Sequence, residues 1–420
     1  MEYNIQSLVK FNAERFGNDP YIYEKEGERF VSHSHKEFFG DVCRLAAYLQ
    51  SQGLTHKKIA IYARNSYEYM VADAAIMGFV GVCVTLSKAW GAYDVGNALG
   101  FLQVDALLYS SDKDDIVSVL KEQHPNILFI PIEKVCAVEG NALKEDLIDI
   151  SDCCKIIFSS GTTGIPKAVM LSQKSMFANW ESLYRRVPMC HDDACYLFLP
   201  MHHTYAGISN FLYSLISGIS IYLCSNPDNM FAEIQEVKPT LFCAVPLIFE
   251  KLYALCNQKG LDPKAFLGGN MKYLFSGGAY LSPALKKYFK KSGLFLCDSY
   301  GLTETSSLVS VEYPNTVDFD SSGTVFENLS VKIDAPDENG IGEIIVKGEN
   351  ICLGYYGNSA LNHTAFDENG YFHTGDLGSL KEDKIYIFGR KKRVIVRSNG
   401  ENVYHENIET LLKEYQTVQQ

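Results

Sequence analysis

Short apolar segments alternate with amphipathic helical patterns through about residue 300, and this alternation constrains the fold more than any other feature. One helix is predicted after the capping box of Ser34 and Glu37, where an apolar face with helical spacing begins. The alternation predicts an α/β fold with two parallel-type sheets covered by helices, and ligands at the strand ends. Strands are predicted at residues 59–63, 80–86, 104–109, 127–132, 155–158, 220–224, 241–245 and 273–275.

Beyond Leu308 the pattern changes to short strands, such as 342–347 and 384–388, separated by Gly, Asp and Asn turns. This spacing predicts an antiparallel, barrel-like β subdomain. A basic run at 390–393 precedes one more predicted strand and a final helix that begins near Glu406.

Composition excludes several classes of protein. The net charge of −12 argues against nucleic acid as the main partner, because phosphate neutralisation needs a basic face. No signal peptide is recognisable, and the most apolar run, 211–224, is too short to span a bilayer. The 12 cysteines contain no C-x-x-C pair, so a zinc site or a disulfide framework is not expected. We therefore expect a cytoplasmic protein.

A run rich in glycine and hydroxyl groups follows the predicted strand 155–158 directly. Small residues let backbone N–H groups converge on a phosphate, hydroxyls add donors, and a lysine adds positive charge. The spacing differs from that of a Walker loop. A flexible surface loop is the alternative, which the position after a buried strand disfavours. The run consists of Ser159, Ser160, Gly161, Thr162, Thr163, Gly164, Ile165, Pro166 and Lys167.

This run resembles the phosphate loop of the adenylate-forming superfamily, which includes acyl-CoA synthetases, peptide-synthetase adenylation domains and firefly luciferase. Four further motifs match in the superfamily's order, so the resemblance covers nearly the whole chain. They are 200–207 (Pro-Met-His-His-Thr-Tyr-Ala-Gly), 276–279 (Ser-Gly-Gly-Ala), 298–304 (Asp-Ser-Tyr-Gly-Leu-Thr-Glu) and 371–376 (Tyr-Phe-His-Thr-Gly-Asp), followed by Gly389 and Arg390.

The resemblance implies a role for each matched residue at the nucleotide. Tyr300 would stack on adenine, and Asp298 would accept a hydrogen bond from the adenine amine. Thr303 would donate to the α-phosphate, and Glu304 would hold Mg²⁺, which prefers carboxylate oxygens. Asp376 would accept from both ribose hydroxyls. The implied nucleotide contacts are Ser159, Ser160, Gly161, Thr162, Thr163, Gly164, Lys167, Gly278, Ala279, Asp298, Ser299, Tyr300, Gly301, Thr303, Asp376 and Arg390.

The implied reaction has two steps. A carboxylate displaces pyrophosphate from ATP, and a thiol then takes the acyl group from acyl-AMP. The carboxylate is already ionised at neutral pH, so the first step depends on positioning and charge neutralisation, without a general base. No G-x-S-x-G is present, which disfavours a hydrolase. The implied catalytic residues are Lys167, His203, Thr303 and Glu304, and the cofactors are ATP and Mg²⁺.

The acid is less well determined than the chemistry. His203 matches the gate between the carboxylate and ATP sites, and the expected pocket residues are His203, Tyr205, Gly277 and Gly301. No aspartate follows His203, which disfavours an α-amino acid. A fatty or other apolar acid is expected, with an aryl acid second. The acceptor thiol is coenzyme A or the phosphopantetheine of an acyl carrier protein; a nucleotide-binding module without turnover is the remaining alternative.

The C-terminal end departs from the superfamily pattern. Residues 1–391 match the large domain, with α/β subdomains at about 1–155 and 156–308 and the β subdomain at 309–391. Lys392 matches the hinge, and 393–420 match only the start of the small α+β domain. The final lysine, Lys413, comes too early to match the superfamily's late lysine. We therefore expect a shortened or processed chain that binds nucleotide but adenylates weakly.

Overall fold

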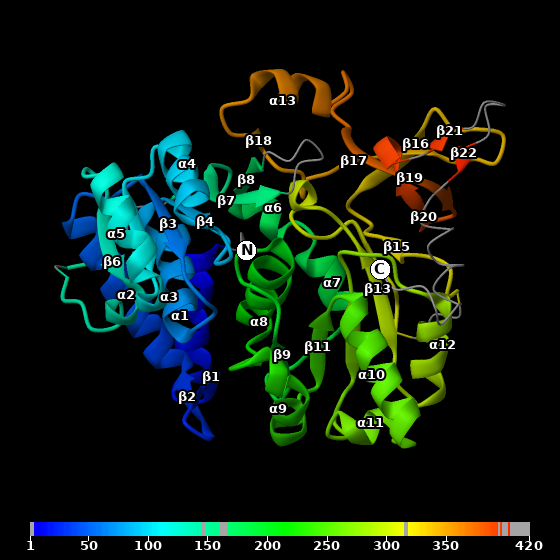
Figure 1. Cartoon of the computed structure of the whole chain (residues 1–420), viewed down its shortest axis with the longest axis horizontal. Helices are drawn as coiled ribbons and strands as arrows, with labels where there is room; N and C mark the ends of the chain where they lie inside the picture. Colours follow the sequence, from blue (N-terminus) through cyan, green and yellow to red (C-terminus); the bar gives the residue numbers. More distant parts are fainter. Residues whose placement is uncertain are drawn as a thin grey trace.

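The computed structural model describes residues 4–140, 142–144, 148–159, 166–314, 318–393, 395–396 and 402–403. Two large sheets with covering helices make up most of the molecule (Figure 1), which confirms the predicted α/β architecture. The predicted final helix near Glu406 lies outside the described residues.

The smaller sheet has seven strands in the order β18-β8-β7-β4-β3-β5-β6. Its parallel strands are β3 (Lys58–Tyr62), β4 (Val82–Thr85), β5 (Ala106–Tyr109), β6 (Leu128–Pro131) and β7 (Cys153–Ser159). β8 (Lys167–Ser172) pairs antiparallel with β7, and β18 (Gly354–Tyr355) pairs antiparallel with β8. A segment from late in the sequence thus forms the edge beside β8.

Both faces of this sheet are covered, which explains its near-continuous apolar strands. Successive residues of β3 point to opposite faces. Ile59 and Ile61 pack on one side with α1 (Ile5–Phe16), α2 (His35–Ser51) and α3 (Tyr67–Ala75). Ala60 and Tyr62 pack on the other side with α4 (Ala92–Leu102) and α5 (Asp114–Gln123). The predicted capping box is present, because Ser34 and Glu37 bond each other's backbone N–H at the start of α2.

The larger sheet has thirteen strands in the order β16-β17-β19-β20-β15-β14-β13-β12-β11-β9-β10-β1-β2. Its parallel centre comprises β9 (Ala194–Leu197), β10 (Ser220–Leu223), β11 (Leu241–Ala244), β12 (Tyr273–Ser276) and β13 (Leu296–Tyr300). The hairpin of β1 (Pro20–Glu26) and β2 (Arg29–Ser34) adds to β10. The helices that follow β8 along the chain are α6 (Gln173–Phe177), α7 (Trp180–Arg186), α8 (Phe211–Ser217), α9 (Met230–Val237), α10 (Pro246–Lys259), α11 (Pro263–Phe266) and α12 (Pro283–Lys291).

The predicted antiparallel strands after Leu308 are present and continue the larger sheet from β13. They are β14 (Ser310–Val311), β15 (Thr324–Val325), β16 (Ser330–Asp334), β17 (Gly342–Lys347), β19 (Phe372–Lys381) and β20 (Lys384–Arg390), with α13 (Ser359–Ala365) between β18 and β19. A separate pair, β21 (Ile395–Val396) and β22 (Asn402–Val403), follows. Strands β16, β17, β19 and β20 lie at the upper right of Figure 1.

Short irregular helices complete the fold. Two are π-helical, η1 (Ile76–Val80) and η4 (Tyr205–Asn210), and the others are 3₁₀ turns, including η6 (Thr303–Thr305) and η7 (Lys391–Arg393). Within the described ranges, no helix is both long enough and apolar enough to cross a bilayer.

Candidate functional site

A cavity of about 1540 Å³ opens where β7, β12 and β13 end beside the antiparallel strands. Parallel strands of an α/β sheet bind ligands at their carboxyl ends. Twelve of the predicted site residues line it: Ser159, Lys167, His203, Tyr205, Gly277, Gly278, Ser299, Gly301, Thr303, Glu304, Arg390 and Lys392. Four others lie outside its lining: Ala279, Asp298, Tyr300 and Asp376. The predicted residues Ser160, Gly161, Thr162, Thr163 and Gly164 fall outside the described part of the chain.

Glu304 is the centre of one polar group in this cavity. Its Oε1 accepts hydrogen bonds from Ser159 Oγ at 3.1 Å and from Tyr355 Oη at 2.9 Å. The ammonium of Lys167 lies 5.2 Å from the centre of the Tyr355 ring. Residues 159 and 167 are register partners on β7 and β8, and this pairing brings both side chains to the same part of the cavity wall. A carboxylate oxygen, hydroxyls and a lysine together suit a magnesium-bound phosphate.

Asp376 is the centre of a second group. The Tyr300 hydroxyl donates to its Oδ2 at 2.8 Å, and Arg390 Nε lies 2.8 Å from its Oδ1. Residues 376 and 390 are register partners on β19 and β20. Burial raises the pKa of Asp376, and the Arg390 charge and the Tyr300 hydroxyl oppose that rise. Each carboxylate oxygen keeps lone-pair capacity for a further donor, such as a sugar hydroxyl.

Asp298 precedes the cavity residue Ser299 and is buried together with Lys286 and Glu312. Its backbone N–H donates to Glu312 Oε2 at 2.7 Å, and Lys286 Nζ donates to Glu312 Oε1 at 3.0 Å. Burial raises the pKa of Asp298 to about 7, with the Lys286 charge opposing and the Glu312 charge adding to the rise. The carboxyl group of Asp298 thus exchanges its proton near neutral pH.

At two of the predicted glycine positions, 301 and 277, the surrounding atoms leave no room for a side chain. A Cβ at Gly301 would lie 1.9 Å from the backbone oxygen of Ser307, so no other residue fits without moving the chain. A Cβ at Gly277 would lie 2.8 Å from Ser299 Oγ and 3.3 Å from Tyr205 Cε1. Both positions allow backbone and neighbouring side chains to approach closely.

His203 lines the cavity beside His202, with their ring centres 4.2 Å apart. Burial lowers the pKa of His203. It also lowers the pKa of His202 to about 3, together with the neighbouring His203. Both imidazoles are therefore neutral at physiological pH and can sit between two anions without carrying charge.

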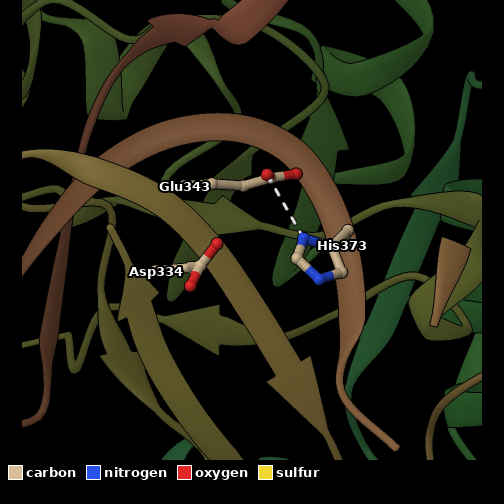
Figure 2. A group of neighbouring side chains, drawn as sticks. All are labelled: Asp334, Glu343 and His373. Carbon is tan, nitrogen blue, oxygen red and sulfur yellow. Dashed lines mark ion pairs between the residues drawn. The ribbon is translucent and has the colours of Figure 1, made fainter. Parts of the chain in front are cut away.

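A third polar group, Glu343 with its neighbours, borders the cavity near the hinge position. Figure 2 shows Asp334, Glu343 and His373 converging, with one ligand atom of each within 4.8 Å of the others. Glu343 Oε2 is 3.2 Å from His373 Nδ1 and 2.7 Å from Lys391 Nζ. Burial alone would raise the pKa of Glu343, but its bonds from Lys391, His373 and the Gly375 N–H lower it. The lysine thus supplies the positive charge at this carboxylate.

Tyr355, Glu343 and Lys391 belong to these polar groups and line the cavity, but the sequence did not predict them as site residues. Tyr355 belongs to a strand of only two residues. Glu343 lies in β17, a strand that was predicted from the sequence but without any functional residue in it. Lys391 lies in the basic run 390–393, and the sequence gives no sign of its ion pair with Glu343 on β17. The only local signal for Tyr355 was its place after the glycine at 354.

Known proteins resemble this chain along most of its length. A model of AMP-binding enzymes matches residues 9–356. The long-chain-fatty-acid–CoA ligase ACSBG2 of Rattus norvegicus is 26% identical over 489 residues, covering 98% of this chain and 73% of that protein. The 2-succinylbenzoate–CoA ligase of Staphylococcus epidermidis is 26% identical over 395 residues, covering 93% of this chain and 78% of that protein.

Solved structures share the fold. The O-succinylbenzoate coenzyme A synthetase (MenE) of Bacillus subtilis, in complex with ATP and magnesium, has a TM-score of 0.85 at 22% identity. The match covers 98% of this chain and 85% of that one. Apo MatB from Rhodopseudomonas palustris has a TM-score of 0.82 at 21% identity, covering 96% of this chain and 82% of that one.

Proposed function

Because the chain belongs to the AMP-binding enzyme family, we propose that it joins a carboxylic acid to AMP from ATP. Pyrophosphate leaves in this step, and the acyl group then passes to the thiol of coenzyme A, which releases AMP. The observation that carries the proposal is that one cavity is lined both by Glu304 with its partners and by Arg390, which is paired with Asp376 just behind the lining. A nucleotide lying across them would meet a metal-binding carboxylate at its phosphates and a diol-binding carboxylate at its sugar.

The residues at the phosphate end suit displacement at phosphorus. Magnesium bound at Glu304 would supply positive charge to the phosphate oxygens. Ser159 and Tyr355 fix the Glu304 carboxylate through two hydrogen bonds to Oε1, so its direction is set before ligands arrive. Lys167 and Thr303 line the same cavity and add a charge and a donor.

The acid would approach from the side of His203 and Tyr205, where the cavity wall includes Gly277. Since both histidines are neutral at pH 7, they neither attract the substrate carboxylate away from phosphorus nor repel it. An ionised carboxylate is already a nucleophile, so the step requires alignment rather than proton removal.

For the acid we propose a fatty or other apolar acyl group, with coenzyme A as acceptor. The name of one relative, a long-chain-fatty-acid–CoA ligase, supports the fatty acid, and a 2-succinylbenzoate–CoA ligase likewise names coenzyme A as acceptor. A carrier-protein thiol is the alternative acceptor.

The test is acid-dependent exchange of labelled pyrophosphate into ATP, run over a panel of aliphatic and aryl acids with magnesium. Exchange with at least one apolar acid supports adenylation. Mass spectrometry of the products with coenzyme A, or with a phosphopantetheinylated carrier, then identifies the acceptor. ATP binding at a place other than the cavity, shown by a crystal soaked in ATP and magnesium, would refute the proposal.

A further inference from the structure

The two cavity histidines lie on a turn, residues 199–203, that follows β9 of the larger sheet. A hydrogen bond from the His203 N–H to the Pro200 carbonyl, 3.1 Å long, closes this histidine turn. Because a proline has no N–H to donate, the turn needs partners from elsewhere to satisfy its remaining backbone groups. The turn residues that line the cavity are Leu199, Pro200, His202 and His203.

One side chain, Asn65, supplies both a donor and an acceptor to the histidine turn. Its Nδ2 donates to the Leu199 carbonyl at 2.8 Å, and its Oδ1 accepts from the Met201 N–H at 2.9 Å. The amide thus bridges the residues on either side of Pro200, in the way that a neighbouring antiparallel strand would. Met201 is fully buried and Leu199 nearly so, so solvent cannot readily replace either bond.

Asn65 belongs to the smaller sheet rather than to the larger one. It lies in the loop between β3 and α3, just beyond the carboxyl end of β3. On the neighbouring strand β4 the last residue, Thr85, donates from Oγ1 to the His202 carbonyl at 3.3 Å. The histidine turn therefore follows a strand of one sheet but is held by side chains from the strand ends of the other.

The smaller sheet also carries groups at the phosphate end of the cavity. Ser159 ends β7 and Lys167 begins β8, and β7 pairs with β4. The bonds from the ends of β3 and β4 therefore fix the position of His203 relative to Ser159 and Lys167. Formation of an acyl-AMP requires the carboxylate and the phosphorus to be aligned, and a misplacement of about 1 Å can cost roughly a hundredfold in rate.

Resting on the function proposed above, we propose that Asn65 is a positioning residue for the adenylation step. Because Asn65 lies outside the cavity lining, it acts through the histidine turn. It holds His203 at a fixed place relative to Ser159 and Lys167, so that the acid meets the phosphate in the aligned geometry.

Asn65→Ala tests this role, because it removes both bonds and adds no charge. The maximal rate of acid-dependent pyrophosphate exchange should fall roughly ten- to a hundredfold. The Kd of ATP, measured by calorimetry, should change by less than about twofold, because the residues at the nucleotide lie on other elements. Asn65→Asp keeps the acceptor for Met201 but loses the donor to Leu199. It should show the same split between rate and affinity, and it serves if Asn65→Ala does not fold.

Gln50→Ala is the matched control. The Gln50 amide makes a bridge of the same kind away from the cavity, where Nε2 donates to the Lys144 carbonyl and Oε1 accepts from the Lys144 N–H, each at 2.9 Å. This variant loses the same two kinds of bond and should keep the exchange rate. Equal maximal rates of Asn65→Ala and Gln50→Ala overturn the inference. An ATP affinity that falls in parallel with the rate in Asn65→Ala also overturns it, because the residue then supports the whole site rather than the turn.

A second readout requires no turnover. Burial lowers the pKa of His203 from its usual 6.5. Loosening of the histidine turn should bring this pKa back toward 6.5, seen by NMR titration of the ring protons in Asn65→Ala but not in Gln50→Ala. An unchanged His203 titration in Asn65→Ala overturns the inference.

The two proposals fail in different ways. Exchange in the unaltered protein without the expected split in Asn65→Ala refutes the positioning role alone. Absence of exchange with every acid, together with absence of ATP binding, refutes the proposed function. If the unaltered protein binds ATP without exchange, the NMR titration decides whether Asn65 holds the histidine turn.

Discussion

The hydroxyl of Tyr300 donates a 2.8 Å hydrogen bond to Oδ2 of Asp376, 76 positions later in the sequence. Arg390 engages the other oxygen of the same carboxylate at 2.8 Å. The group predicted to hold the ribose is therefore oriented from both sides. In the resemblance Tyr300 meets the base, so this hydrogen bond joins the predicted base and sugar contacts.

Changing Tyr300 to Phe tests this link. The variant keeps the ring but leaves Oδ2 of the buried Asp376 without its donor, so the free energy of unfolding should fall by about 1–3 kcal/mol. ATP affinity, measured by calorimetry, should fall as well, because the carboxylate loses its orientation. As a control, Tyr386→Phe removes a hydroxyl bonded to Asp318 away from the cavity and should leave ATP affinity unchanged. Unchanged ATP affinity in Tyr300→Phe would contradict the proposed ribose site.

Changing Glu304 to Gln removes the charge predicted to hold magnesium. The rate of pyrophosphate exchange should fall roughly a hundredfold or more, and the magnesium concentration for half-maximal rate should rise. Glu349→Gln provides the control, since that side chain is 64% exposed and pairs with Lys174 at the surface. A magnesium dependence identical in Glu304→Gln and the unaltered protein would mean that the ion binds elsewhere.

Gly301→Ala should destabilise the fold. The added Cβ would lie 1.9 Å from the backbone oxygen of Ser307, so the chain must move, at a cost of about 2–4 kcal/mol. Urea denaturation measures the change. Gly40→Ala is the matched control: it lies within α2, has nothing within 4 Å of its Cβ, and should gain about 0.5–1 kcal/mol. Equal stabilities of the two variants would refute the steric argument.

Asp298 should make stability depend on pH. The folded protein holds this proton up to a pKa of about 7, whereas the unfolded chain releases it near the ordinary aspartate pKa of 3.8. The folded state thus binds more protons between those values, and the free energy of unfolding falls as pH rises through that window. Asp298→Asn should remove this slope, seen as a smaller loss of Tm from pH 4 to 7.

The contribution of Asp298 is obtained by subtracting the pH dependence of Tm of the Asp298→Asn variant from that of the unaltered protein. Burial lowers the pKa of His35 from 6.5 to about 4, so its contribution has the opposite sign: stability is lost as pH falls from 6.5 toward 4. His35 acts in both proteins and cancels in the difference. A pH slope that Asp298→Asn leaves unaltered would contradict the assignment.

Much of the fold could be predicted because strand and helix periodicity is local. The predicted strand at 342–347 coincides with β17, and the one at 241–245 differs from β11 by one residue. The hairpin β1–β2 was missed, because its strands are stabilised by pairing with β10 about 200 positions away, where Ser220 Oγ bonds the Pro20 carbonyl. Nothing in residues 20–34 alone indicates that partner.

The sequence by itself indicated the family, which the match to AMP-binding enzymes confirms, and it predicted the chemistry, since phosphate, metal and sugar each need particular functional groups. Only the tertiary structure decided which groups act together. Tyr355 reaches Glu304 because β18 pairs with β8, and Arg390 reaches Asp376 because β19 pairs with β20. Such contacts depend on sheet order and helix geometry, which are set by the packing of the whole chain rather than by any short stretch of it.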